Sequence, residues 1–370
     1  MKLLLINSVC GIGSTGRICS AIADEYKSNG WEVRIAYGRG NVPSHCMDSA
    51  IRIGNSLGML MNALECRCFD NDGLSARNAT RRFIKWANEY DPDELWLHNL
   101  HGYYINYELL FSWIESRPNM KVKWTLHDCW AVTGHCCYFA KCNKWLSCCG
   151  DCPLTKTYPA SFTDKSKRNF NKKKEIFSIS NPDRVLIYVP SEWLKNIVAR
   201  SFLGKYRITV NSNTVDSSVF KPVKSDIKTK FGIENKKMIL GVASQWTERK
   251  GLNSFLTLSK YLPDDYVIFL VGLTKKQISK IGKNMIGITK TSDVEELVRI
   301  YSAADLFVNP SSEETFGMTT LEAISCGSQV LVFKDTACEE VAKKYGGLVC
   351  ENNNNSLIQA VLAYFGEENV

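Results

Sequence analysis

Two series of apolar, strand-like runs, separated by helix-like stretches, constrain the fold of this chain more than any other feature. The first series comprises Leu3–Asn7, Val33–Tyr37, Glu94–Leu97, Val122–Leu126 and Val185–Val189. The second series comprises Met238–Ser244, Tyr266–Gly272, Leu306–Ser311 and Gln329–Phe333. Strands that alternate with helices are typical of parallel, doubly wound α/β sheets. The sequence therefore predicts two α/β domains in tandem.

A polar, turn-rich segment separates the two series. This segment, Asn211–Lys230, contains Pro222, which interrupts any helix. A length of 370 residues also exceeds what one hydrophobic core usually serves. We therefore expect a first domain over residues 1–209 and a second over residues 210–370. Open α/β sheets bind ligands at the carboxyl ends of their strands, so we expect a ligand cleft between the domains.

Composition indicates a globular protein without a membrane span. Hydrophobic residues make up 45% and charged residues 23% of the chain. The N-terminal run Met1–Val9 predicts a buried strand rather than an export signal, and no stretch reaches about 18 apolar residues. We expect a cytoplasmic protein that is at most peripheral on the inner membrane. Its fifteen cysteines are then expected to be thiols or metal ligands.

The formal net charge of +8 suits anionic ligands or an anionic membrane face. The densest basic stretch comprises Lys165, Lys167, Arg168, Lys172, Lys173 and Lys174. Such a stretch is most often a solvated helix face. The alternative is contact with lipid headgroups or with a pyrophosphate-linked acceptor.

A glycine-rich loop follows the first predicted strand. Gly11, Gly13 and Gly16 form a GxGxxG pattern that continues into a helix-like stretch. Such glycines allow a sharp turn that brings backbone amides against a phosphate, and we expect Gly13 and Gly16 to bind substrate there. A packing turn is the alternative. The second strand ends near Arg39 rather than at an acidic residue, which disfavours NAD and leaves an NADP-dependent oxidoreductase open.

A second loop with features of a phosphate site follows the strand that ends at Asn309. This loop carries Glu314 and Gly317 into a predicted helix over Thr320–Cys326, which contains Glu322. Helix N-termini offer amides to phosphate groups. Two cations, Arg249 and Lys250, follow the first strand of the same domain, where they would stabilise a departing diphosphate. Surface carboxylates without a special role are the alternative for each glutamate.

Motifs over nearly the whole length resemble those of glycosyltransferase family 4, and within it the colanic-acid and capsule-type enzymes. They read GSTGRI, DGLSARNAT, LHNLHGYYIN, WTLHDCWAVTGHC, CGDCP, VPSEWL, RKGL, SAADLFVNPS and ETFGMTTLEAISCG. The resemblance implies a GT-B fold of two Rossmann-like domains and transfer with retained anomeric configuration. It implies no catalytic metal or other required cofactor.

The resemblance also implies roles for individual residues. Glu314 faces the donor sugar and Glu322 holds the nucleotide ribose, as the two glutamates of an EX7E signature. Lys250 and the amides around Gly317, Met318 and Thr319 contact the diphosphate, and His127 reaches toward the donor sugar from the opposite wall. A buried structural histidine is the alternative for His127. The acceptor hydroxyl would attack from the face that the diphosphate leaves; a double displacement would use Glu314 as nucleophile.

The implied partners are a UDP- or GDP-sugar donor and an undecaprenyl-linked saccharide acceptor at the inner-membrane surface. No nucleic acid is expected. The product would be a bacterial surface polysaccharide such as O-antigen, capsule or exopolysaccharide. His98, His101, Tyr103 and Tyr104 are candidate acceptor-side groups, with aromatic packing as the alternative.

Four departures from the family pattern stand out. The usual arginine is replaced around Ser244 and Gln245, so Arg249 is expected to substitute for it. The junction, which usually reads NGVD in the family, reads Asn213-Thr214-Val215-Asp216 here. A glycine pair that the family pattern places near residues 335–340 is missing. The chain stops at Val370, where similar enzymes continue into a helix that crosses back, so we expect weaker clamping of the domains.

A cysteine-rich insertion spans about residues 134–153. Cys136, Cys142, Cys149 and Cys152 suit a structural zinc site, because zinc prefers four tetrahedral ligands such as thiolates. Reduced thiols packed in a loop are an equal alternative. A zinc-knuckle protein that binds nucleic acid is the rival class, but the surrounding residues are mixed rather than basic.

Overall fold

The computed structural model describes residues 1–139 and 141–366. The end of the chain at Val370, on which the expectation of weaker clamping depends, lies outside this part. The chain divides into two compact units, Met1–Pro190 with Leu194–Asn211, and Ser191–Trp193 with Ser212–Val370. The main division thus falls two residues beyond the expected boundary, and Ser191–Trp193 groups with the second unit. Across the described residues, every helix is too short or too polar to span a bilayer.

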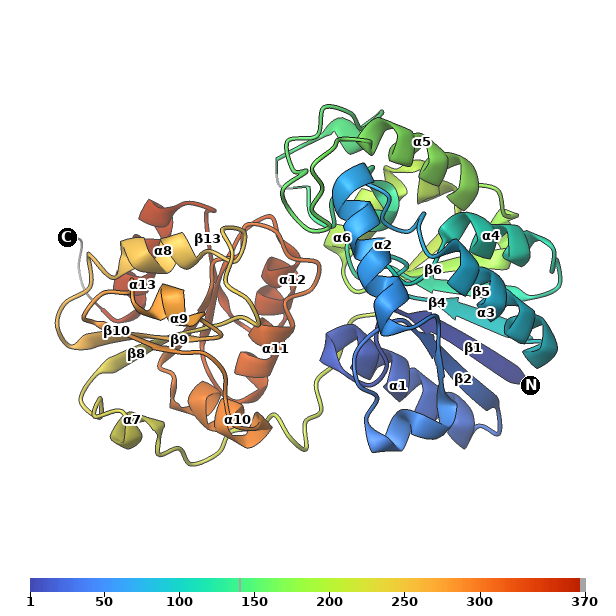
Figure 1. Cartoon of the computed structure of the whole chain (residues 1–370). Helices are drawn as coiled ribbons and strands as arrows, with labels where there is room; N and C mark the ends of the chain where they lie inside the picture. Colours follow the sequence, from blue (N-terminus) through green and yellow to red (C-terminus); the bar gives the residue numbers. More distant parts are fainter. Residues whose placement is uncertain (140, 367–370) are drawn as a thin grey trace. The chain divides into compact units, whose positions relative to one another are not determined.

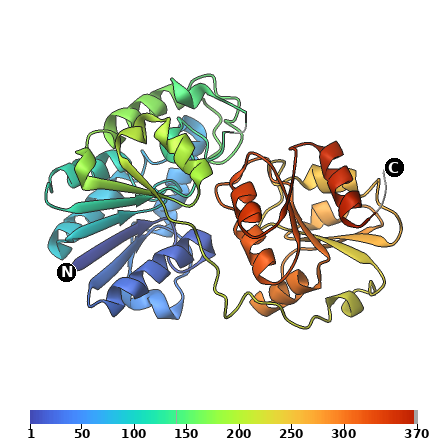
Figure 2. The same cartoon turned by 180° about the vertical axis from the view of Figure 1, so that it is seen from behind.

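The first unit is built on a parallel sheet (Figures 1 and 2). Its strands and helices are β1 (Lys2–Asn7), α1 (Gly13–Ser28), β2 (Glu32–Tyr37), β3 (Ala50–Arg52), α2 (Ser56–Phe69), α3 (Arg77–Tyr90), β4 (Glu94–Leu97), α4 (Tyr107–Glu115), β5 (Lys121–Thr125), α5 (Ser166–Phe177), β6 (Val185–Val189), α6 (Glu192–Ala199) and β7 (Arg207–Val210). Within the described residues the strand order is β3-β2-β1-β4-β5-β6-β7. The chain reverses its direction of winding between β1 and β4, which is where open α/β sheets bind ligands.

The second unit repeats this plan. Its elements are α7 (Ile227–Lys230), β8 (Lys237–Val242), α8 (Leu252–Leu258), β9 (Tyr266–Val271), α9 (Lys275–Ile278), β10 (Met285–Ile288), α10 (Val294–Ala303), β11 (Leu306–Asn309), α11 (Met318–Ser325), β12 (Val330–Phe333), α12 (Ala337–Lys344), β13 (Leu348–Cys350) and α13 (Asn354–Tyr364). The strand order among the described residues is β10-β9-β8-β11-β12-β13. The reversal here lies between β8 and β11, which pair in parallel with Ile239 opposite Leu306.

Both faces of the second sheet are buried, which explains why its central strands are continuous apolar runs. Met238 and Leu240 of β8 pack into one core, whereas Ile239 packs into another on the opposite face. Successive side chains of a strand point to opposite faces, so a strand covered on both sides needs apolar residues throughout.

All the strands that the sequence predicts are present, with ends that differ by one or two residues. The structure adds β3, β7, β10 and β13, which the sequence analysis missed. Each of these four strands lies at an edge of its sheet. An edge strand has one neighbour and is only partly buried, so its sequence lacks a continuous apolar run.

Gly251 provides a test of how tightly the loop after β8 is packed. It has a φ of 77°, and a Cβ there would collide with the carbonyl oxygen of Pro310. Gly232 has a φ of 64° but open space around it. We expect Gly232→Ala to cost about 1–2 kcal/mol in free energy of unfolding, from backbone strain alone. Gly251→Ala should cost a further 1–3 kcal/mol or so, because the new methyl group is overpacked.

Urea denaturation of both variants measures the difference. Equal losses of stability would mean that the loop after β8 relaxes away from Pro310 without cost.

Candidate active site

Lys250 and Glu314 meet where the chain reverses between β8 and β11. Lys250 lies in the loop after β8, and Glu314 lies in the loop after β11. The Lys250 ammonium donates a hydrogen bond to the Glu314 carboxylate, and the Arg249 guanidinium stands 3.6 Å from the same oxygen. Glu314 is buried and both cations are partly exposed. The structure therefore brings together three residues that the sequence analysis selected.

Main-chain contacts fix these two loops to each other. The Ser312 amide donates to the Arg249 carbonyl at 2.9 Å, and the Arg249 guanidinium donates to the Glu313 carbonyl at 2.6 Å. The buried Asn309 side chain accepts hydrogen bonds from the amide and hydroxyl of Ser311 and donates to the Thr320 hydroxyl. The loop after β11 is therefore held at both of its ends.

Gly317 is the residue from which α11 begins. It has a φ of 89°, and a Cβ there would lie 2.5 Å from the Cys338 sulfur, so only glycine fits without strain. The helix starts at Met318, two residues earlier than predicted. The amides of Met318 and Thr319 therefore belong to its first turn, where amides lack partners within the helix and suit an anion.

Glu322 lies inside α11 and has a separate environment from Glu314. Its carboxylate accepts a hydrogen bond of 2.9 Å from the Tyr301 hydroxyl of α10, and both side chains are buried. Burial and the adjacent carboxylate raise the pKa of Tyr301, which keeps its phenol a hydrogen-bond donor. The sequence analysis missed Tyr301, because nothing in the local pattern marks it as a partner of Glu322.

The glycine loop of the first unit combines packing with open space. The Gly11 amide donates to the Gly16 carbonyl, and a Cβ on Gly16 would lie 3.1 Å from a methyl group of Val9. Close packing therefore accounts for Gly16. Gly13, by contrast, has a φ of 64° and nothing within 4 Å of its Cβ position, and α1 begins there. A ligand phosphate would thus meet Gly13 rather than Gly16.

His127 follows β5 and contacts His98, which follows β4. Nδ1 of His98 lies 2.9 Å from Nε2 of His127, and the two rings stack with centroids 5.2 Å apart. Burial lowers the pKa of His127 to about 4, and burial also holds the pKa of His98 well below its usual value. Both rings are therefore neutral at pH 7, and one donates its N–H to the other.

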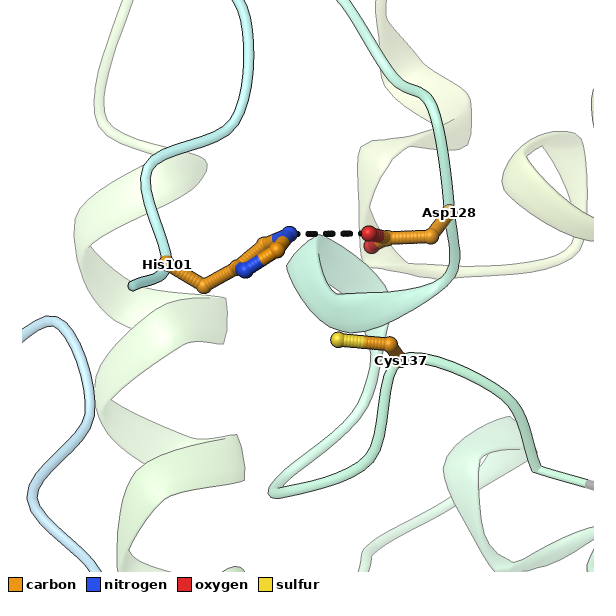
Figure 3. A group of neighbouring side chains, drawn as sticks. All are labelled: His101, Asp128 and Cys137. Carbon is orange, nitrogen blue, oxygen red and sulfur yellow. Dashed lines mark hydrogen bonds and ion pairs between the residues drawn. The ribbon is translucent and has the colours of Figure 1, made fainter. Parts of the chain in front are cut away.

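A second pair at the same strand ends joins His101 to Asp128. Nε2 of His101 lies 2.8 Å from the Asp128 carboxylate, and Nδ1 lies 3.2 Å from the Tyr158 hydroxyl. The dashed line in Figure 3 marks the contact with Asp128. Burial lowers the pKa of His101, but the Asp128 and Asp72 carboxylates together raise it above its usual value. Burial raises the pKa of Asp128, but His101, the Trp130 amide and His127 together lower it below its usual value. The sequence analysis named His101 and missed Asp128 and Tyr158.

Cys137 completes the group drawn in Figure 3. Among residues 1–139 and 141–366, His101, Asp128 and Cys137 are the one set of three or more potential metal ligands whose ligand atoms lie within 4.8 Å of one another. Both ring nitrogens of His101 already contact protein groups, and the Asp128 carboxylate also accepts from the Trp130 amide. The His101 and Asp128 side chains are therefore already engaged in hydrogen bonds within the protein.

The four cysteines predicted to bind zinc line a single cavity of about 10 Å³. They are Cys136, Cys142, Cys149 and Cys152. Within the described residues, no three of these four sulfurs lie within 4.8 Å of one another. His135 also lines this cavity: its Nδ1 contacts the buried Asp70 carboxylate at 2.6 Å, and its Nε2 has no hydrogen-bond partner in the described part of the chain.

The basic stretch over residues 165–174 is not a uniformly solvated face. Lys173 is fully buried, donates to the carbonyls of Trp130 and Thr133, and stands 3.5 Å from the centroid of the Trp130 ring. Burial lowers its pKa to about 8. Arg168 and Lys172 also bond to groups of the first unit. The prediction of a solvated helix face is therefore wrong for Lys173.

Known proteins are similar in sequence to parts of both units. Residues 223–369 match the family model described as glycosyl transferases group 1. The putative colanic acid biosynthesis glycosyl transferase WcaC of Escherichia coli is 24% identical over 305 residues, which are 79% of this chain and 72% of that protein. Several other curated relatives match over less than half of their own length.

Solved structures resemble the whole chain. Sucrose-phosphate synthase from Thermosynechococcus elongatus has a TM-score of 0.69 at 15% identity, over 99% of this chain and 90% of that one. HepE of Anabaena, in complex with UDP and glucose, has a TM-score of 0.63 at 16% identity over the same shares. The chain therefore has the GT-B fold that its motifs predict, and its second unit contains the stretch that matches the glycosyl transferases group 1 model.

Proposed function

We propose that the chain is a retaining glycosyltransferase of family 4, of the colanic-acid and capsule type, which takes its sugar from a UDP- or GDP-sugar. The observation that carries this proposal is the meeting of Lys250 with Glu314 beside the start of α11, within the domain that matches the family model. The complex of HepE with UDP and glucose supports a nucleotide-sugar donor.

The donor diphosphate is assigned to the Lys250 ammonium, the Arg249 guanidinium and the amides of Gly317, Met318 and Thr319. Positive charge and amides aimed at one place stabilise the charge that builds on a departing phosphate oxygen. Because Lys250 is paired with Glu314, a diphosphate that binds the ammonium must compete with this carboxylate. Glu314 is then released toward the donor sugar.

Glu322 is assigned to the ribose of the nucleotide. Its Oε2 accepts from Tyr301, which fixes the orientation of the carboxylate. An ionised carboxylate can accept several hydrogen bonds, so one oriented in this way suits two neighbouring ribose hydroxyls.

Transfer with retention needs no dedicated protein base in this proposal. The bond between the anomeric carbon and the phosphate oxygen breaks with its electron pair on the phosphate. The acceptor oxygen bonds to the anomeric carbon on the same face, and its proton passes to the departing phosphate oxygen. A double displacement through a Glu314 glycosyl ester remains the alternative, as in retaining glycosidases.

The first unit is assigned to the acceptor, with His127 contacting the donor sugar. The neutral pair of His127 and His98 supports a role as hydrogen-bond donor or acceptor rather than as a cation. The proposed acceptor is an undecaprenyl-linked saccharide at the inner-membrane surface, in the synthesis of a bacterial surface polysaccharide. The similarity to the putative colanic acid biosynthesis glycosyl transferase of Escherichia coli supports the polysaccharide part of this proposal.

We also propose that the cysteine-lined cavity holds a structural zinc ion. The four cysteines share one cavity, the Gly134 amide donates to the Cys149 sulfur at 3.2 Å, and the Leu154 amide hydrogen-bonds to Cys152. Amides that donate to sulfur suit thiolates, which zinc requires. Zinc binding would bring the sulfurs closer together. His135 lines the same cavity and could replace Cys136 as the fourth ligand.

Substitutions of Lys250 and Glu314 are expected to separate donor binding from turnover. Lys250→Ala removes a charge-assisted contact worth about 1.5–3 kcal/mol, so the Kd for UDP should rise roughly tenfold to a hundredfold. Glu314→Gln removes a carboxylate beside the diphosphate, so UDP should bind as well or better while turnover falls about a hundredfold or more. Calorimetric titration and product assays measure both effects.

Lys228→Ala is the matched control for Lys250→Ala. Lys228 pairs with Asp305 at 2.7 Å in the same unit, and its exposure is similar to that of Lys250. Asp305, however, directly precedes β11, so it lies at the amino end of that strand, whereas Glu314 follows the carboxyl end. The assignment fails if Lys228→Ala weakens UDP binding as much as Lys250→Ala. Near-full activity of Glu314→Gln would exclude both its sugar contact and its nucleophile role.

The zinc proposal predicts about one zinc ion per purified chain. Cys149→Ser should lose this zinc and lower the melting temperature, and a chelator should do the same to the wild type, because a structural metal contributes folding energy. Cys68→Ser replaces an exposed cysteine outside the cavity and should keep both properties. Elemental analysis of Cys136→Ser and His135→Gln then identifies the fourth ligand. A metal-free, fully stable wild type would contradict the proposal.

A further inference from the structure

The helix α2 presents its apolar side chains to solvent. Leu57, Leu60, Met61 and Leu64 recur at the spacing that places them on one face of a helix, and all are exposed. Cys66 is the one fully buried residue of α2. A helix of a globular domain normally turns such a face toward the core. In α2 the apolar face points toward solvent instead.

A further aromatic residue extends this surface at the end of α2. The Phe162 amide donates to the Arg67 carbonyl at 2.7 Å, and the Arg67 guanidinium lies over the Phe162 ring. We call the exposed set the α2 apolar patch. Its members, with exposed fractions between 53% and 77%, are Leu57, Leu60, Met61, Leu64, Phe69 and Phe162. Contiguous exposed apolar residues of this kind mark an interaction site.

Arginines border the patch across a groove. The groove has a volume of about 610 Å³ and is lined by Leu57 and Met61 of α2 and by Arg77, Arg81 and Arg82 of α3. All three arginines are exposed. Arg77 pairs with Glu108, and Arg81 contacts Asn78. Apolar side chains and guanidinium groups therefore share one surface of the first unit.

The charge beside the patch decides between its possible occupants. A second copy related by two-fold symmetry would present the same apolar side chains and arginines, so its patch would bring no anionic group to the arginines. An anionic bilayer offers acyl chains to the apolar side chains and phosphate groups to the arginines. We propose that the α2 apolar patch and the arginines of α3 form a peripheral docking surface for an anionic phospholipid bilayer.

This inference places membrane contact on α2 and α3 rather than on the basic stretch over residues 165–174, where Lys173 is buried. It rests on the proposed function only for the identity of the acceptor. Binding to vesicles requires neither donor nor turnover, so the two proposals can fail separately.

The test uses the full chain and co-sedimentation with vesicles of phosphatidylcholine, with and without phosphatidylglycerol. We expect binding to the vesicles that contain phosphatidylglycerol, weakened by salt. Leu60→Ser/Leu64→Ser and, separately, Arg81→Glu/Arg82→Glu should each lower the partition coefficient on the order of tenfold or more. Melting curves and UDP titration of each variant show that it is folded.

Two matched controls sit in the second unit. Tyr345→Ser removes an exposed aromatic residue, and Lys275→Glu/Lys276→Glu reverses two exposed charges on α9. Both controls should bind vesicles as the wild type does. The proposal would be overturned if the α2 and α3 variants bound vesicles as strongly as the wild type does. Light scattering that shows a dimer which the leucine variant dissociates would also overturn it, because the patch would then join two copies.

Discussion

Parallel pairing of β8 with β11 is the constraint on which the candidate active site depends. The pairing sets the carboxyl ends of two strands side by side, and the chain leaves them in opposite winding directions. Lys250 and Glu314 are 64 residues apart in the chain, yet they meet because their loops leave neighbouring strands. The pairing of β1 with β4 does the same in the first unit, where the glycine loop and His98 follow adjacent strands.

Burying charged side chains beside these strand ends requires partners for each of them. Unpaired buried charge is costly, whereas a buried group with hydrogen bonds is tolerated. Glu314 has Lys250, Glu322 has Tyr301, Asp128 has His101, and Lys173 has two carbonyl oxygens. In the proposed function, a polyanionic donor would exchange the pairing of Lys250 with Glu314 for a pairing of Lys250 with phosphate.

The sequence predicts those parts of the fold that local pattern determines. Central strands are apolar throughout because both of their faces are covered, so a continuous apolar run predicts them. Edge strands such as β3 and β13 are only partly buried, so no such run marks them. The motif residues Lys250, Glu314 and Gly317 were found because glycine and charge after a strand are local signals. Tyr301, Asp128 and the burial of Lys173 depend on contacts between distant segments, which one sequence does not display.

Hydrogen exchange of backbone amides, measured with UDP, GDP and NADP in turn, tests the central claim most directly. The account predicts that UDP or GDP protects the amides from Gly317 to Thr319 and the loop around Lys250, because a diphosphate held there would shield them from solvent. NADP should leave both regions unchanged. Protection of the amides around Gly13 by NADP, with no effect of either nucleoside diphosphate on the second unit, would contradict the account and favour an oxidoreductase.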